Sequence, residues 1–299
     1  MQLGIGLPNT MAHETGRSLM LDWARLSNEA GFEVLGTIDK PNYDSWDPLV
    51  TLAGVAGVTE RIGLATTILQ LPPRNEVLVA KHAAVVDQLS AGRLTLGVSQ
   101  GGREDDYELL GAEFKGRSER FERQVNRIRE IWEGAGESDR DHGVLGPAPV
   151  QKPAPPIWVG ASTPKAIERA ARVADGFLFG TAGSEAMTER APGVRDTFAG
   201  HGKPDATIAG LAYVAIGDDP QEALDEATHH VLRYYGRLWT EPENLIHHGP
   251  AEKIAEEVAA YADAVDVLIV VPEIPDLGQV EQLAEHVLPA YAGAAQAAR

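Results

Sequence analysis

Short apolar runs alternate with longer segments of helical period along most of this chain, and this alternation restricts the possible folds more than any other feature. Apolar runs of about five to eight residues are typical of strands, and the interposed segments are typical of the helices that cover a parallel sheet. Eight such units favour a closed (β/α)8 barrel, the TIM-barrel fold of the α/β class with insertions in the βα loops, over an open doubly wound sheet. The expected strands are Gln2–Leu7, Glu33–Ile38, Ile62–Leu69, Leu94–Ser99, Pro156–Gly160, Gly176–Gly180, Ile208–Ile216 and Val265–Val271.

Several of the intervening segments begin with a recognisable helix start. Ser18 is expected to cap a helix whose apolar residues fall on one face. The pairs Asp47–Pro48, Thr163–Pro164 and Asp219–Pro220 each join an N-cap residue to a proline that suits the first helical turn. A further helix is predicted over Ala251–Asp263.

Two segments interrupt this regular order. Gly146–Pro156, with the sequence "GPAPVQKPAPP", is too rich in proline for a helix and is expected to form an extended surface insertion. Arg237–Gly249 is polar and aromatic and lies between two predicted helices. Neither segment reads as a linker between domains, so we expect a single barrel domain over residues 1–299.

The composition excludes several classes of function. The 299 residues carry a formal charge of −18 and contain no evident basic patch, so a nucleic-acid partner is not expected. The absence of cysteine excludes disulfides, iron–sulfur clusters, thiolate zinc sites and a cysteine nucleophile. The first residues lack a basic leader, and no run reaches the roughly 18 apolar residues of a membrane span, which predicts a cytoplasmic protein without a membrane partner.

In a barrel of this kind the chemistry lies at the carboxyl ends of the strands, and two of these ends stand out. The segment "VGASTP" places Ser162 and Thr163 at the start of a helix, where hydroxyls and free backbone N–H groups suit an anion such as a phosphate. The alternative is that Thr163 only caps its helix. Gly101 and Gly102, after the fourth strand, permit either a turn with positive φ or the close approach of a flat ligand.

Other polar groups are expected to be structural or exposed. The acidic run Glu104–Glu108 is interpreted as a solvated helical face, and no metal site is expected. The adjacent pairs His229–His230 and His247–His248 favour a surface position over metal ligation. Tyr234–Tyr235 and Trp239 form either barrel packing or the wall of an apolar substrate pocket.

Four segments together cover nearly the whole chain: "MQLGIGLP", "TERIGLATTILQLPPRNEVLVAKHAAVVDQLSAGRLTLGVSQGGREDDYELLGAEFKGRSERFER", "PPIWVGASTPKAIERAARVADGFLFG" and "GPAEKIAEEVAAYADAVDVLIVV". Their order and spacing resemble the luciferase-like family of flavin-dependent oxidoreductases. Members of that family are (β/α)8 barrels that use reduced FMN or the deazaflavin coenzyme F420. The resemblance implies a monooxygenase that uses reduced FMN and O2 on a small organic substrate, with an F420-dependent hydride-transfer enzyme as the alternative.

The resemblance also assigns roles to residues at the strand ends. A non-prolyl cis peptide is expected at Thr67–Ile68, against the flavin ring. Ser99, Gln100 and Gly101 would lie under the ring or along the ribityl chain, while Gly160, Ser162 and Thr163 would hold the phosphate. A homodimer formed through helices early in the barrel is implied, as is a flavin reductase that supplies the reduced cofactor.

The chain departs from its relatives at two positions. Many relatives have histidine after the acidic residue at the second strand exit, where this chain has Asp39–Lys40, the pair to which the catalytic role is assigned. Lysine could stabilise a developing anion, but without a lowered pKa it is a poor base. Some relatives place an arginine for the phosphate at Gln100, so Arg103 or backbone donors are expected to substitute.

Two hypotheses outside redox catalysis stay open at this point. A phosphate-binding barrel lyase or isomerase would explain "VGASTP", with Lys40 as its Schiff-base lysine. A non-catalytic flavin-binding barrel would explain the same motifs without turnover.

Overall fold

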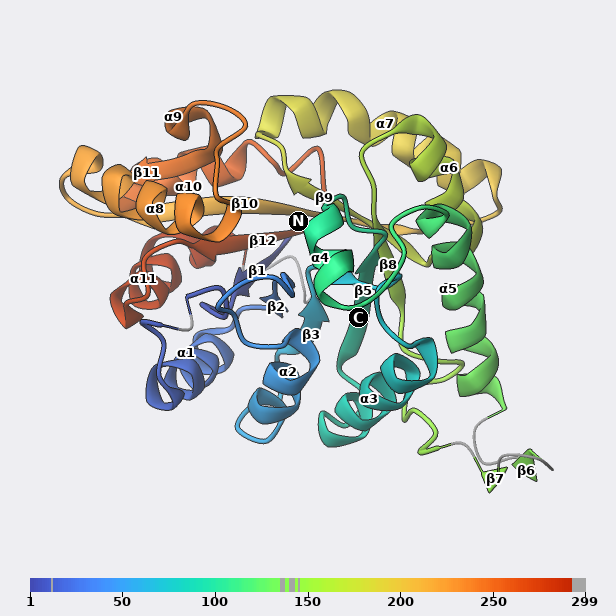
Figure 1. Ribbon diagram of the computed structural model, residues 1–299. Helices are drawn as coiled ribbons and strands as arrows, with labels where there is room; N and C mark the ends of the chain where they lie inside the picture. Colours follow the sequence, from blue (N-terminus) through green and yellow to red (C-terminus); the bar gives the residue numbers. More distant parts are fainter. Residues whose placement is uncertain (12, 135–137, 140–142, 145, 292–299) are drawn as a thin grey trace.

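The eight predicted strands close into one parallel barrel in the computed structural model of the protein, which describes residues 1–11, 13–134, 138–139, 143–144 and 146–291 (Figure 1). The first strand pairs with both the second and the last, and the sixth pairs with the seventh, so the sheet has no gap. This arrangement confirms the predicted (β/α)8 fold. The barrel strands are β1 (Gln2–Gly6), β2 (Val34–Thr37), β3 (Gly63–Thr66), β5 (Leu94–Ser99), β8 (Ile157–Gly160), β9 (Gly176–Thr181), β10 (Thr207–Ile216) and β12 (Val267–Pro272).

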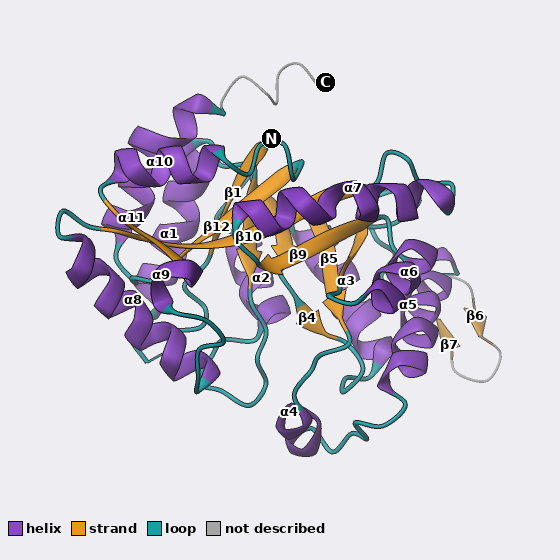
Figure 2. Ribbon diagram, turned by 90° about the horizontal axis from the view of Figure 1, so that it is seen from above, coloured by secondary structure: helices purple, strands orange, loops and turns teal. Residues whose placement is uncertain are grey.

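Helices cover the outside of the barrel (Figure 2). The principal ones are α1 (Arg17–Ala30), α2 (Pro48–Ala56), α3 (Glu76–Leu89), α5 (Arg117–Glu133), α6 (Pro164–Val173), α7 (Ser184–Gly200), α8 (Pro220–Tyr235) and α10 (Ala251–Ala259). Shorter helices are α4 (Glu104–Leu109), α9 (Pro242–Leu245) and α11 (Leu277–Gln282), the last followed by one π-helical and one 3₁₀ turn. Among the described residues no helix combines the length and apolarity needed to cross a membrane.

Apolar side chains form one cluster between strands and helices and a second inside the barrel. Strand β10 shows the alternation that divides them. Leu211 and Tyr213 belong to the interior cluster, whereas Ala212 and Val214 pack toward the helices. The interior side chains of β10 therefore point toward the barrel axis, below the place where a site at the barrel mouth would lie.

The helix starts agree with the sequence at three of the four predicted caps. Asp47, Thr163 and Asp219 each accept a hydrogen bond from a backbone N–H of the first turn. The prediction for Ser18 is wrong, because α1 begins at Arg17 and its N-cap position is Gly16, two residues before Ser18, with no side-chain cap.

The third and the seventh units differ from the expected pattern. The run Ile62–Leu69 is divided into β3 and β4 (Leu69–Gln70) by a cis peptide bond between Thr67 and Ile68, as the resemblance implied. The polar segment Arg237–Gly249 contains α9 and a strand, β11 (Ile246–Gly249), that pairs with the end of β10. Sequence reading missed this strand because "IHHG" lacks an apolar run.

The insertion before the fifth barrel strand leaves the body of the barrel. A small antiparallel hairpin, β6 (Ser138–Asp139) with β7 (Gly143–Val144), projects beyond α5 in both views (Figures 1 and 2). Gly146–Pro156 has no helix or strand, as its prolines predicted. Backbone N–H groups of Val150 and Gln151 tie this segment to the Asp87 carboxylate.

Candidate functional site

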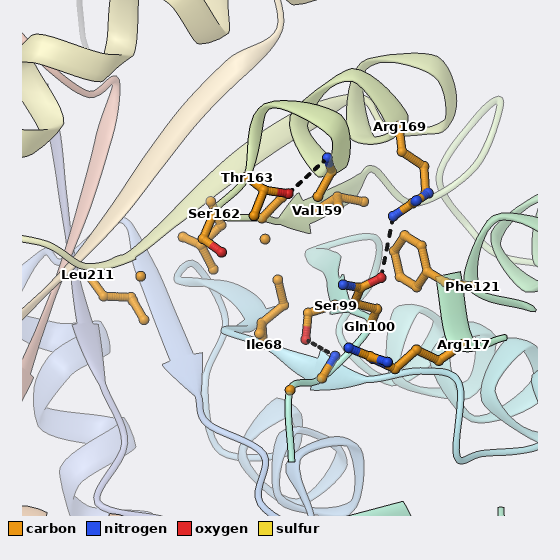
Figure 3. Close-up of a pocket in the computed structure, with 17 residues that line it drawn as sticks. Ile68, Ser99, Gln100, Arg117, Phe121, Val159, Ser162, Thr163, Arg169 and Leu211 are labelled. Atoms are coloured by element: carbon orange, nitrogen blue, oxygen red, sulfur yellow. Dashed lines mark hydrogen bonds between the residues drawn. The ribbon is translucent and has the colours of Figure 1, made fainter. Parts of the chain in front are cut away.

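A cavity of about 480 Å³ opens where the carboxyl ends of the barrel strands meet (Figure 3). Its size falls in the range of small-molecule and cofactor pockets. Apolar walls come from several strands and from α5, and polar side chains gather toward the start of α6. The apolar residues are Ile68, Phe121, Val159, Leu178 and Leu211.

Most residues to which the resemblance assigned cofactor contacts lie around this cavity. They are Ile68, Ser99, Gln100, Gly101, Gly160, Ser162 and Thr163. Thr67 does not line it, because this residue is buried and its hydroxyl donates to the carbonyl of Thr37.

The start of α6 forms one end of the cavity. Thr163 Oγ1 accepts a hydrogen bond from Ala166 N at 3.3 Å, so this residue does cap the helix. Its side chain and that of Ser162 nevertheless face the cavity (Figure 3). The positive end of the helix dipole therefore lies at the cavity wall, which is an arrangement that suits an anion.

Two arginines that the sequence analysis did not select also line the cavity. Arg169 reaches in from α6 and donates to Gln100 Oε1 at 3.3 Å, and Arg117 reaches in from the start of α5 (Figure 3). The guanidinium of Arg117 lies 3.7 Å from the Phe114 ring centroid, and among the described residues its buried Nε has no hydrogen-bond partner. Arg169 lies in the second turn of α6, six residues after the capping Thr163, and nothing in the sequence marks Arg117.

Arg103, which was expected to replace a missing phosphate arginine, does not line the cavity. Its guanidinium pairs with Asp105 at 2.6 Å and donates to the carbonyl of Tyr235 at 3.1 Å. Arg117 and Arg169 line the cavity instead.

The two glycines at the exit of β5 are under different steric constraints. Gly101 has a φ of +68°, and a Cβ on it would lie 2.5 Å from Gln70 Oε1, so the turn itself requires glycine. A Cβ on Gly102 would meet no atom within 4 Å. Both residues border the cavity, so the turn is confirmed at Gly101, and the close approach of a flat ligand stays a prediction.

The predicted catalytic pair does not line this cavity. Asp39 is buried and accepts hydrogen bonds from Gln70 N at 2.9 Å and from Arg74 Nη2 at 2.8 Å. Burial raises the pKa of its carboxyl to about 6 even though Arg74 acts in the opposite direction. The side chain of Lys40 instead turns toward the rings of Tyr43 and Tyr234.

Two expectations about polar residues need correction. The acidic run is not wholly a solvated face, because Asp106 is fully buried and accepts from Gln70 Nε2 at 3.0 Å and from Asn42 N at 3.2 Å. His230 is buried rather than superficial, and its Nδ1 lies 2.6 Å from the carbonyl of Glu273. Sequence alone could not show that these helix faces are covered by neighbouring loops.

A model of the family described as luciferase-like monooxygenase matches residues 1–295. The chain belongs to the luciferase-like family. Among curated relatives, the oxygenase component of a flavin-dependent trigonelline monooxygenase from Acinetobacter baylyi is 25% identical over 72% of this chain and 63% of that protein. The match with another relative, an uncharacterized protein of Mycobacterium bovis, covers 48% of its length, so the chain spans about half to two thirds of these relatives.

Solved luciferase-like structures share the fold. A monooxygenase from Streptomyces bottropensis superposes with a TM-score of 0.80 at 20% identity, over 97% of this chain and all of that one (100%). A coenzyme F420-dependent tetrahydromethanopterin reductase from Methanopyrus kandleri gives 0.75 at 18% identity, over 97% and 100%. At these sequence identities the structural similarity establishes only the barrel fold. The reaction has to be inferred from the residues of the site.

The described part of this luciferase-like chain holds no group of three or more histidine, aspartate or glutamate side chains placed to bind a metal ion.

The aromatic residues that were expected either to pack in the barrel or to line a substrate pocket differ in their exposure. Tyr234 is buried and packs edge-on against Tyr43 and Tyr235, whereas Trp239 is 52% exposed.

Proposed function

We propose that this protein is a flavin-dependent monooxygenase that uses reduced FMN and O2 on a small organic substrate. The observation that carries the proposal is the cavity at the barrel mouth, which has apolar walls and ends at Arg117, Arg169 and the start of α6. A flat ring with a phosphorylated side chain matches this division into an apolar part and a cationic part. The buried, unpartnered Nε of Arg117 supports the fit, because a phosphate oxygen would supply the acceptor that the described residues lack.

The predicted cofactor residues take complementary parts in this proposal. Ser162, Thr163 and the backbone at Gly160 bind the phosphate together with the two arginines. Ile68, beside the Thr67–Ile68 bond, supports the ring, and Ser99, Gln100 and Gly101 follow the side chain of the cofactor. Reduced FMN, when bound, supplies the electrons and the reaction with O2. The protein positions the substrate and excludes water from it.

Of the two residues predicted to be catalytic, we propose that Lys40 contacts the substrate and that Asp39 positions it. The two hydrogen bonds that Asp39 accepts fix the strand exit on which Lys40 lies. An F420-dependent oxidoreductase is the second candidate, supported by the likeness to the Methanopyrus reductase.

We also propose two partners. The name of the Acinetobacter relative, an oxygenase component, supports a separate flavin reductase as the source of reduced FMN. A homodimer is supported by apolar side chains exposed on α2 and α3, namely Val50, Val77 and Leu78. The cytoplasmic location stays a prediction from the sequence.

Cofactor titration tests the proposal. The purified protein is titrated with FMN, anaerobically reduced FMN and F420, and O2 consumption is followed with a flavin reductase and NADH across a substrate collection. We expect reduced FMN to bind and F420 not to bind. Binding of F420 alone would transfer the proposal to the second candidate, and FMN binding without turnover of any substrate would favour the non-catalytic barrel. Borohydride trapping of a substrate on Lys40 would instead indicate a Schiff-base lyase.

A further inference from the structure

Lys40 lies in a cage of tyrosine rings beside the proposed flavin cavity. Its Nζ is 4.7 Å from the ring centroid of Tyr43, 4.8 Å from that of Tyr234 and 5.8 Å from that of Tyr235. The residue is only 5% exposed. Ring faces attract a cation, but a lysine this deeply buried normally also has a negatively charged partner.

The neighbouring carboxylates are occupied elsewhere. No carboxylate of the described residues lies within 4 Å of Lys40 Nζ, and no hydrogen bond to a described residue uses that atom. Asp105 pairs with Arg103, and Asp106 accepts from Gln70 and Asn42. The ammonium group therefore has aromatic faces around it and no acceptor among the described residues.

The tyrosines around Lys40 are neutral donors. Burial raises the pKa of Tyr234 well above its usual value and that of Tyr235 to about 12. The hydroxyls of Tyr213 and Tyr235 lie 2.6 Å apart and share one hydrogen bond. Burial, followed by the nearby Arg103, lowers the pKa of Lys40 to about 8, whereas Asp106 and Asp105 act in the opposite direction.

The cage lies next to the cavity in the barrel interior. Leu211 lines the cavity and Tyr213 follows two residues later on the same inward face of β10. Ile68, also in the cavity wall, packs in the same interior cluster as Tyr43 and Tyr235. A molecule bound against the cage would therefore lie next to the proposed ring site.

We propose that this cage is the substrate half of the site and that it binds an organic anion, such as an aromatic carboxylate. The anionic oxygen would accept hydrogen bonds from the Lys40 ammonium, and the apolar part of the substrate would lie against the tyrosine rings. A cationic substrate is disfavoured because Lys40 already fills the cage with a positive charge. The reaction undergone by the anion rests on the proposed function, but its binding does not.

Calorimetric titration with two simple probes of matched shape tests this inference. Benzoate carries the anion, and benzamide is its uncharged analogue. We expect wild-type protein to bind benzoate more tightly than benzamide, with or without FMN. Lys40→Met should weaken benzoate binding roughly 10- to 100-fold and leave benzamide binding unchanged, since one hydrogen bond to a charged group is lost. Lys40→Arg should retain most of the benzoate affinity.

The control variant is Lys81→Met, which removes the same charge from an exposed position on α3 and should leave the benzoate affinity unchanged. In wild-type protein the benzoate affinity should fall as the pH rises through about 8, where Lys40 loses its proton. This pH series keeps the test decisive if Lys40→Met does not fold.

Three outcomes would overturn the inference: equal affinity for benzoate and benzamide, unchanged benzoate affinity in Lys40→Met, or tighter binding of benzyltrimethylammonium than of benzoate. FMN titration of the same samples separates the two proposals. If wild-type protein does not bind FMN, the proposed function is contradicted. The benzoate titration of the protein without FMN still decides whether the cage binds anions.

Discussion

Arg117 and Arg169 contribute the cationic side chains at the end of the cavity where a phosphate would bind. They come from different helices, and their contacts differ. Arg169 already donates to Gln100, whereas a buried nitrogen of Arg117 has no partner among the described residues. Arg117 is therefore the residue whose removal should affect the phosphate most directly.

We expect Arg117→Ala to weaken FMN binding roughly 10- to 100-fold, because charge-assisted hydrogen bonds to the phosphate would be lost. Quenching of flavin fluorescence measures the affinity. Riboflavin, which has no phosphate, should bind the variant and the wild type equally. Arg127→Ala removes an arginine from the exposed face of the same helix, where it pairs with Glu130 at 3.0 Å, and should have no effect. Equal FMN affinity in Arg117→Ala and wild type would contradict the phosphate assignment.

A second residue-scale prediction concerns Glu273, which is 4% exposed just after β12. Burial raises the pKa of its carboxyl from the usual 4.5 to about 8. The folded protein therefore keeps this proton over a pH range in which the unfolded chain has released it. The free energy of unfolding should fall as the pH rises from about 4.5 to about 8, by at most about 1.4 kcal/mol per pH unit.

Urea unfolding at a series of pH values measures this effect. Glu273→Gln should remove this pH dependence and be more stable than wild type at pH 8. Glu281→Gln, an exposed site on α11, should follow the wild-type curve. Parallel curves for wild type and Glu273→Gln would show that the carboxyl titrates normally.

At the scale of the element, α8 links a helix start on the surface to the tyrosines of the cage. Asp219 Oδ1 accepts from Gln221 N at 2.9 Å and from Glu222 N at 3.2 Å, and the far end of the helix carries Tyr234 and Tyr235. The cap is exposed and distant in sequence from the cage. Its contribution to stability can therefore be measured separately from function.

Asp219→Ala should lower the free energy of unfolding by about 1 kcal/mol, the usual value of an N-cap side chain. The adjacent exposed Asp218 makes no hydrogen bond with the described residues, so Asp218→Ala is the matched control and should change little. Chemical denaturation compares the two variants. If both lose the same stability, general charge effects rather than capping explain the loss.

At the scale of the whole molecule, the exposed apolar side chains on α2 and α3 bear on assembly. Val50 is 69% exposed and Leu78 is 53% exposed, on two helices that pack against each other. Neighbouring exposed apolar residues of this kind are typical of a protein interface. They agree with the homodimer that the family resemblance implied.

Light scattering after gel filtration should give the mass of a dimer for the wild type. Val50→Asp with Leu78→Asp should shift the mass toward the monomer, since two charges would be buried in the contact. Leu232→Asp, at a 41% exposed position on α8, should leave the dimer intact. A monomeric wild type would contradict the dimer, and a dimer unaffected by both changes would place the interface elsewhere.

The sequence by itself determined the barrel and the position of its mouth. Apolar runs such as Ile208–Ile216 specify strands because both faces of a parallel barrel are buried, and caps such as Asp219–Pro220 specify helix starts through local hydrogen bonds. These signals are local, so they can be read without a structure. The glycine turn at Gly101 and the helix start at Gly160–Thr163 were located for the same reason, whereas Ser99 and Gln100 were assigned through the family resemblance.

Tertiary structure alone decided which distant side chains meet. Arg117 faces the cavity because α5 packs beside α6, and β11 forms because β10 offers a free edge to a polar segment. The cage around Lys40 joins residues from the loop after β2 and from the end of α8, which are nearly 200 positions apart along the chain. Burial and charge at such a place depend on packing between elements, and no local pattern in the sequence encodes that packing.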